Sequence, residues 1–217
     1  MTAGPVDRRR LGGHLGRVVA LFSGLVLIGV GAVLTLKAAL GVSPWDVLHA
    51  GVSARAHLGF GTVVIGVGVV VLAASLLLGV RPGWGTIVNL VVIGWVENLV
   101  LASGFLAGLH DDALALRLVV LLLGIGAQGF GCALYIGAAY GAGPRDGLMV
   151  AVHHRLRMPV GLARAGVELA ALAVGVLLGG PVGVGTLLFA VGIGPAVQLS
   201  FRLLGSTPRQ ETAAEPA

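Results

Sequence analysis

The chain has 217 residues, of which 57% are hydrophobic and 11% charged, and its mean hydropathy is +1.00. A soluble domain of this length cannot bury so much apolar surface, so the composition excludes a soluble protein and indicates an integral membrane protein. The formal net charge is +5, but the arginines lie between apolar runs and form no basic stripe with aromatic residues. This pattern excludes a nucleic-acid partner and leaves the lipid bilayer as the first partner.

Six apolar runs are long enough to cross the roughly 30 Å of hydrocarbon in a bilayer, which takes about 20 helical residues. The sequence therefore predicts an all-α, polytopic membrane protein. Polar tails are predicted over residues 1–16 and 205–217, and an external linker over residues 107–116. The predicted spans, in chain order, are residues 17–40, 60–79, 86–106, 117–139, 160–179 and 186–204.

The chain is an internal duplication with an offset of 100 residues. Residues 41–48 read Gly-Val-Ser-Pro-Trp-Asp-Val-Leu, and residues 141–148 read Gly-Ala-Gly-Pro-Arg-Asp-Gly-Leu. The same offset continues on both sides, and low-complexity sequence would not bring all of these pairs into one register. Residues 17–106 and 117–204 are thus predicted as two three-helix repeats. Matching pairs are Arg17 with Arg117, Gly24 with Gly124, Gly31 with Gly131, Gly61 with Gly161, and Gly83-x-Gly85-Thr86 with Gly183-x-Gly185-Thr186.

An odd number of spans in each repeat predicts that the second repeat enters the membrane from the opposite side, so that the two repeats are inverted. With both termini in the cytoplasm, only Lys37, Arg55 and Arg117 of the 14 Lys and Arg residues lie outside. This distribution follows the positive-inside rule. We expect a multi-pass protein of the bacterial plasma membrane, with one short helix after each Pro-x-Asp phrase.

The two Pro-x-Asp phrases have a structural and a functional interpretation. Ser43 suits an N-cap, proline suits the first helical position, and an acid in the first turn complements the helix dipole. In the functional interpretation, Asp46 and Asp146 are equivalent carboxylates at the two ends of a substrate or coupling-ion path. His49, one turn after Asp46, is then its partner, whereas the second repeat has Met149 there.

The two Gly-x-Gly-Thr phrases begin the third span of each repeat. Their glycines permit a tight turn and close helix contact, and the threonine can cap the helix. Alternatively, exposed amides at a helix start can face an anionic ligand, as in inverted-repeat transporters. The ligand-facing candidates are Gly83, Gly85, Thr86, Gly183, Gly185 and Thr186.

Glu97 and Glu168 are acids inside apolar runs, where an ionised group costs about 2.5 to 3.5 kcal/mol. The equivalent positions hold Val197 and Gly68, so the repeats differ here, as an asymmetric ligand would require. Asn89 adds a polar group on the run that contains Glu97. The structural alternative is that Glu168 pairs with Arg164 four residues earlier and that Glu97 bonds a neighbour.

Four stretches of the chain together form a recognisable pattern: residues 41–49, 60–62, 81–89 and 143–149. With them, the chain resembles the YczE/YitT-like family of bacterial membrane proteins over about residues 17–204. The family implies a multi-spanning protein of the plasma membrane, and an acid near Glu97 is typical of it. It implies no settled biochemical activity.

The intramembrane acids and the duplication favour a secondary transporter or exporter of a small solute, with its site between the repeats. The alternative is a scaffold or accessory subunit of another membrane system. An enzyme is not expected, because we find no nucleophile with its base and no dinucleotide or phosphate loop. No metal-ligand spacing or cofactor motif is present, so neither is expected. Six short, glycine-rich spans enclose little volume, which makes a homodimer plausible.

Overall fold

The computed structural model describes residues 13–80, 82–141 and 143–205, and these residues form helices and contain no strand. Six of the helices are long and apolar enough to cross a membrane, in agreement with the six predicted spans. The spanning helices are α1 (Gly13–Lys37), α3 (Phe60–Leu77), α4 (Trp84–Ala102), α5 (Leu114–Ala138), α7 (Val160–Leu177) and α8 (Val184–Leu203); the shorter ones are α2 (Pro44–Ala56), η1 (Leu109–Asp111) and α6 (Pro144–Leu156).

Most of the two predicted tails lies outside the described residues. These are residues 1–12 of the N-terminal tail and residues 206–217 of the C-terminal tail. Arg81, from the stretch 81–89, and Ala142, from the repeated phrase at 141–148, lie outside them too. The predicted short helices after the Pro-x-Asp phrases are present as α2 and α6, each beginning at its proline.

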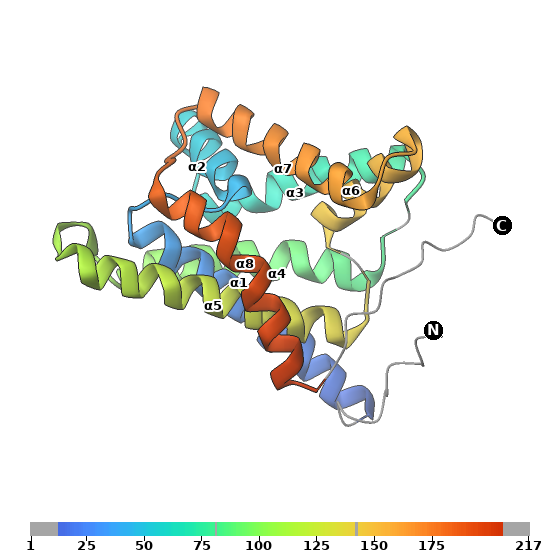
Figure 1. The fold of residues 1–217 in the computed structure, drawn as a ribbon, viewed down its shortest axis with the longest axis horizontal. Coiled ribbons are helices and arrows are strands. Elements are labelled where there is room, and N and C mark those ends of the chain that lie inside the picture. Colours follow the sequence, from blue (N-terminus) through green and yellow to red (C-terminus); the bar gives the residue numbers. More distant parts are fainter. Residues whose placement is uncertain (1–12, 81, 142, 206–217) are drawn as a thin grey trace.

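Helices α1 and α5 cross at the centre of the molecule and pack closely along their length (Figure 1). Glycines make this approach possible. A Cβ atom at Gly24 would lie 2.7 Å from the carbonyl oxygen of Gly131, and one at Gly124 would lie 2.8 Å from that of Gly31. Small residues in register let membrane helices approach to backbone contact. Each half thus supplies the same two glycines to one central interface.

An arginine from each half caps the last turn of the other half's central helix. Arg17 donates from Nε to the carbonyl oxygen of Ala138 at 2.9 Å, and Arg117 donates from Nε to that of Ala38 at 2.9 Å. Carbonyl groups at a helix end have no partner within the helix and carry the negative end of its dipole. The repeated arginines therefore hold the two central helices together by equivalent contacts.

The short helix of each half packs on a spanning helix of the other half. Helix α2 packs on α7, and α6 packs on α3. The first contact is tighter, because a Cβ atom at Gly175 would lie 2.5 Å from the amide nitrogen of Leu48, whereas one at Gly147 would lie 3.6 Å from Ser75 Oγ. The α2 and α6 helices therefore lie between the halves.

One pair of equivalent helices is packed in the first half and separated in the second. Helix α3 packs along α4, with Gly61 and Gly94 in backbone contact. Asn98 Oδ1 accepts from the amide of Gly61 at 3.0 Å and joins the same two helices. Helices α7 and α8 make no comparable packing contact over the described residues, and they run apart from the loop that joins them (Figure 1). The equivalent glycines, Gly161 and Gly194, have open space around them.

Candidate functional site

A cavity of about 260 Å³ lies between the two halves. Of the 31 described residues that line it, 28 form 14 pairs whose numbers differ by 100, so equivalent positions of the two halves face one space. The paired side chains nevertheless differ in chemistry. The position equivalent to Glu97 holds Val197, and the position equivalent to Gln128 holds Ile28. The wall of the cavity is therefore symmetric in position and asymmetric in its polar groups.

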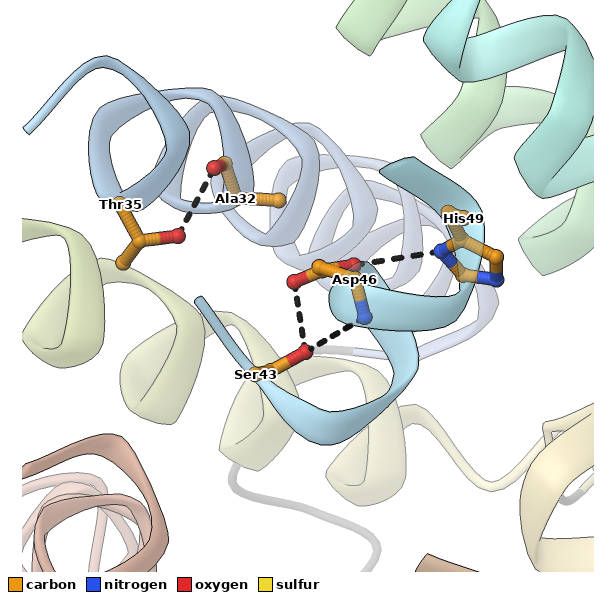
Figure 2. Close-up of polar contacts among 5 residues, drawn as sticks. All are labelled: Ala32, Thr35, Ser43, Asp46 and His49. Atoms are coloured by element: carbon orange, nitrogen blue, oxygen red, sulfur yellow. Dashed lines mark hydrogen bonds and ion pairs between the residues drawn. The ribbon is translucent and has the colours of Figure 1, made fainter. Parts of the chain in front are cut away.

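Asp46 lies in the first turn of α2 and is held by its neighbours (Figure 2). Ser43 is the N-cap, and its hydroxyl donates to Asp46 Oδ2 at 2.6 Å while accepting from the amide of Asp46 at 3.1 Å. His49 Nδ1 lies 3.3 Å from Asp46 Oδ1. Thr35 Oγ1 donates to the carbonyl oxygen of Ala32 within α1, so it does not bind Asp46. The N-cap role predicted for Ser43 is confirmed.

The environment of Asp46 fixes the protonation of the Asp46–His49 pair. Burial alone would raise the pKa of Asp46, but the His49 hydrogen bond, the charge of Arg145 and the Ser43 hydroxyl together hold that pKa below its ordinary value. Burial, and then Arg145, lower the pKa of His49 although Asp46 opposes this. At neutral pH the pair is thus an ionised carboxylate beside a neutral imidazole, which donates from Nδ1.

Asp146 lies at the equivalent position of α6 and has a different environment. Burial raises the pKa of Asp146, and the nearby charges of Arg164 and Arg145 offset only part of this effect. The Arg145 guanidinium lies 5.0 Å from the centre of the Trp45 ring, within cation–π range. The sequence predicted Asp46 and Asp146 at two ends of a path; the structure instead places both on one cavity, because α2 and α6 begin between the halves.

Glu97 and Gln128 each have one buried polar atom that finds no partner among the described residues. Glu97, on α4, is 1% exposed, and its Oε2 atom has no hydrogen-bond partner among the described residues. Gln128, on α5, is 7% exposed, and its Nε2 atom likewise has none. Buried polar groups are nearly always bonded, so two orphaned atoms in one cavity indicate a place for another molecule. The neighbour that the sequence suggested for Glu97 is not found at Oε2.

Glu168 and Arg164 form the ion pair that their spacing suggested. Arg164 Nε donates to Glu168 Oε1 at 3.0 Å, and both side chains are partly exposed on α7. Both line the cavity, on the side where α7 stands apart from α8. Glu168 therefore has the ion pair of the structural interpretation and also a place on the cavity.

Asn89 also lines the cavity, from α4. A Cβ atom on Gly143, the residue before Pro144, would lie 3.7 Å from Asn89 Nδ2 and 3.4 Å from Asp146 Oδ2. The amide is thus near the start of α6 and near its carboxylate. All six residues predicted for the path lie on the cavity: Asp46, His49, Asn89, Glu97, Asp146 and Glu168.

The six helix-start residues predicted as ligand-facing do not line this cavity. The amide of Gly85 donates to the carbonyl oxygen of Tyr140 at 3.0 Å, and that of Gly185 donates to the carbonyl oxygen of Leu40 at 2.6 Å. Gly83 and Gly183 likewise pack against the backbone of the opposite half. The glycines thus make the close helix contacts that the structural interpretation expects. Thr86 and Thr186 are buried where the two halves meet. We therefore leave these residues out of the site.

Gln128 and Arg145 also line the cavity, although the sequence pointed to Gln128 only as a further polar group in an apolar run and assigned no role to Arg145. Gln128 is a polar residue in an apolar run, which was the available signal, but its orphaned amide depends on packing against α1. A Cβ atom at Gly31 would lie 2.7 Å from Gln128 Cγ, so the side chain passes over a glycine. Arg145 stands inside the repeated phrase, where its duplication partner is the aromatic Trp45.

Comparison with known proteins gives the family. A family described as "Family of unknown function (DUF6198)" matches residues 15–202. The chain belongs to this family. The chain is also similar to an uncharacterized protein of Haemophilus influenzae, with 36% identity over 190 residues that cover 88% of this chain and 85% of the relative.

Two proteins of Bacillus subtilis are also similar. The uncharacterized membrane protein YczE is 32% identical over 206 residues, which cover 90% of this chain and 92% of YczE. The uncharacterized protein YyaS is 24% identical over 172 residues, which cover 76% and 82%. No solved structure matches. The resemblance to YczE-like proteins is thus confirmed, and the chain is a multi-pass membrane protein of a family whose function is unknown.

Proposed function

We propose that the protein is a secondary transporter that moves a small solute by alternating access to the cavity between its halves. The cavity is of a size for a small solute and contains buried polar groups without partners. Such groups are expensive in a membrane protein and are retained where they face a substrate or ion path. A scaffold, the alternative, needs no such cavity.

The observation that supports this proposal is a difference between two equivalent pairs of helices. We call the facing sides of α3 and α4 the α3–α4 seam, and those of α7 and α8 the α7–α8 seam. The α3–α4 seam is closed by Gly61 against Gly94, whereas Gly161 and Gly194 of the α7–α8 seam stand apart. The second seam keeps the parts needed to close, because Gln198 stands where Asn98 joins the first seam. In alternating access, one of two equivalent seams is closed while the other is open. A closed α3–α4 seam beside an open α7–α8 seam is what one of the two states requires.

The proposal includes the topology. Two inverted halves exchange their seams across the membrane, so that one seam opens on each side in turn. The reciprocal Arg17 and Arg117 caps support this arrangement, because the two arginines are equivalent residues that make the same contact with equivalent helix ends of the opposite half. The distribution of Lys and Arg supports cytoplasmic termini in a bacterial plasma membrane.

The first test is whether the open seam closes. In a Cys132→Ser background, Leu162→Cys and Gln198→Cys place two thiols across it, at the positions equivalent to Thr62 and Asn98, whose side chains meet at 3.1 Å across the closed seam. We expect an oxidant to form the disulfide in native membranes, because the closed state brings these side chains into contact. Gly166→Cys with Gln198→Cys is the control pair, since Gly66 and Gly166 both have open space and lie at no seam. Equal yields from both pairs would contradict the proposal.

The second test is flux in proteoliposomes with labelled methylammonium, alanine, glucose and phosphate. We expect the protein to take up at least one of these solutes. Gly161→Leu should abolish that uptake, because the open α7–α8 seam has room for the leucine side chain and a closed seam does not. Gly166→Leu, on the same helix, should retain uptake. No uptake of any probe, with no disulfide across the seam, would favour a scaffold.

A further inference from the structure

We infer that the cavity takes a small organic cation with N–H donors and a separate hydrogen-bond acceptor, bound between Glu97 and Gln128. This inference rests on the proposed function, since it names the class of solute for the same cavity. Glu97 offers an acceptor at Oε2 and Gln128 a donor at Nε2, and neither has a partner among the described residues. A primary ammonium group that also carries a hydroxyl or carbonyl oxygen satisfies both atoms.

The two orphaned atoms belong to side chains that flank one turn of α1. A Cβ atom at Gly29 would lie 2.9 Å from Val96 Cγ1, next to Glu97 in the chain, and one at Gly31 would lie 2.7 Å from Gln128 Cγ. Helices α4 and α5 therefore pack against α1 at glycines only two residues apart, at nearly the same height along α1. Ile28 and Ala32 of α1 face the cavity beside them, so an apolar stem can lie against this helix.

The charged groups of the cavity can bind a cation. The described residues that line it carry four carboxyl groups, from Asp46, Glu97, Asp146 and Glu168, and two guanidinium groups, from Arg145 and Arg164. Arg164 is paired with Glu168 at 3.0 Å, and the charge of Arg145 acts on Asp46. Glu97 has no ion pair among the described residues, and a cation that binds beside its carboxyl group favours the ionised form of that group.

An organic cation fits these groups better than a metal ion does. The described residues contain no group of three His, Cys, Asp or Glu side chains placed to hold a metal ion. The amide of Gln128 presents an N–H donor, which a metal cannot use but an oxygen atom of an organic solute can. The neighbouring wall is aliphatic, with Ile93 and Val67 among its side chains, and suits a short carbon chain.

The test compares three compounds of similar size with the purified full chain in detergent. They are 3-aminopropan-1-ol, propane-1,3-diol, which lacks the charge, and choline, which has the charge but no N–H donor. Thermal unfolding is followed at constant ionic strength. We expect 3-aminopropan-1-ol to raise the unfolding temperature with saturation and the other two to leave it unchanged, because a ligand that binds the native state stabilises it.

Three variants locate the binding. Glu97→Gln and Gln128→Leu should each weaken binding, Glu97→Gln by about ten- to a hundredfold, the range for losing a charge-assisted hydrogen bond. Asp111→Asn, at an exposed acid of η1, should bind normally. Equal shifts from all three compounds, no shift from 3-aminopropan-1-ol, or unchanged binding in Glu97→Gln would overturn the inference. Amine binding at Glu97 without flux in liposomes would instead refute transport and leave the ligand class standing.

Discussion

At the scale of single residues, the duplication gives the same side chain two different electrostatic environments. Asp46 has a hydroxyl, an imidazole and a nearby guanidinium, which together outweigh burial and lower its pKa. For Asp146 burial prevails and the pKa is raised. Gly143 stands where Ser43 caps the first helix, so the second carboxylate lacks that hydroxyl. The ionised form is thus favoured at Asp46 and disfavoured at Asp146.

Asparagine at each of these positions is expected to change stability in opposite directions at neutral pH. The folded pKa of Asp46 lies below its unfolded value, so its stabilising effect is present above about pH 3.8 and is lost as pH falls through the folded pKa. Asp46→Asn should therefore lower the unfolding temperature at pH 7. A shift of about 2–4 °C corresponds to about 1 kcal/mol in a chain of this size.

For Asp146→Asn the expected change in unfolding temperature at pH 7 has the opposite sign. The folded pKa of Asp146 lies above the unfolded value, so the native state loses stability as pH rises through the interval between them. Asp146→Asn should raise the unfolding temperature at pH 7, and the gain should shrink as pH approaches 4. Thermal unfolding by tryptophan fluorescence from pH 4 to 8 measures both variants. Shifts of the same sign at pH 7 would show that the two environments are alike.

Glu97 is expected to cost stability when the cavity holds no ligand. A buried polar atom without a partner destabilises by about 1–3 kcal/mol, and Glu97 Oε2 is such an atom. Glu97→Leu should therefore raise the unfolding temperature by several degrees while abolishing amine binding. Val197→Leu, at the equivalent position on the same cavity, is the control and should change neither much. A less stable Glu97→Leu protein would mean that the carboxyl group has a structural partner.

At the scale of helices, the apolar runs and the proline phrases were enough to predict nearly every element. Apolar length fixes the spans, and Ser43-Pro44 fixes where α2 begins, because these signals are local. The cavity was only partly predictable. An acid in an apolar run pointed to Glu97, but the placement of Asp46 and Asp146 on one cavity depends on how α2 and α6 pack across the halves. No local pattern carries that information.

The glycines of the central crossing are expected to be sensitive in proportion to the contact that each makes. On α5, a Cβ atom at Gly131 would lie 2.5 Å from the carbonyl oxygen of Gly24, whereas one at Gly126 meets no atom within 4 Å. Gly131→Ala should destabilise by about 1–3 kcal/mol, as overpacking does. Gly126→Ala should be neutral or slightly stabilising. Thermal unfolding in detergent distinguishes them, and equal tolerance would mean that α1 and α5 are farther apart in the membrane.

At the scale of the whole molecule, two halves with equivalent contacts at their centre differ at their edges. The α1–α5 crossing and the arginine caps occur in matched pairs, so this core can stay fixed. The α3–α4 and α7–α8 seams do not match, and the cavity lies between them. In the proposed exchange of the two seams the central contacts stay in place, so its free-energy cost falls on the seams and on the unequal α2–α7 and α3–α6 contacts. A small change at one seam should therefore shift the balance between states.

Gly61→Ala is expected to favour the opposite state. The new methyl group would collide with the backbone of Gly94, so it destabilises the state in which α3 and α4 are packed. The opposite state has that seam open and α7–α8 closed, and it bears no such collision. A penalty of about 1–2 kcal/mol changes a two-state ratio by a factor of about 5 to 30. Adding Gly61→Ala to the Cys132→Ser protein with Leu162→Cys and Gln198→Cys should accordingly speed disulfide formation several-fold, while Gly66→Ala leaves the rate unchanged. Slower formation, or an unfolded protein in place of a faster-reacting one, would show that the seams do not exchange.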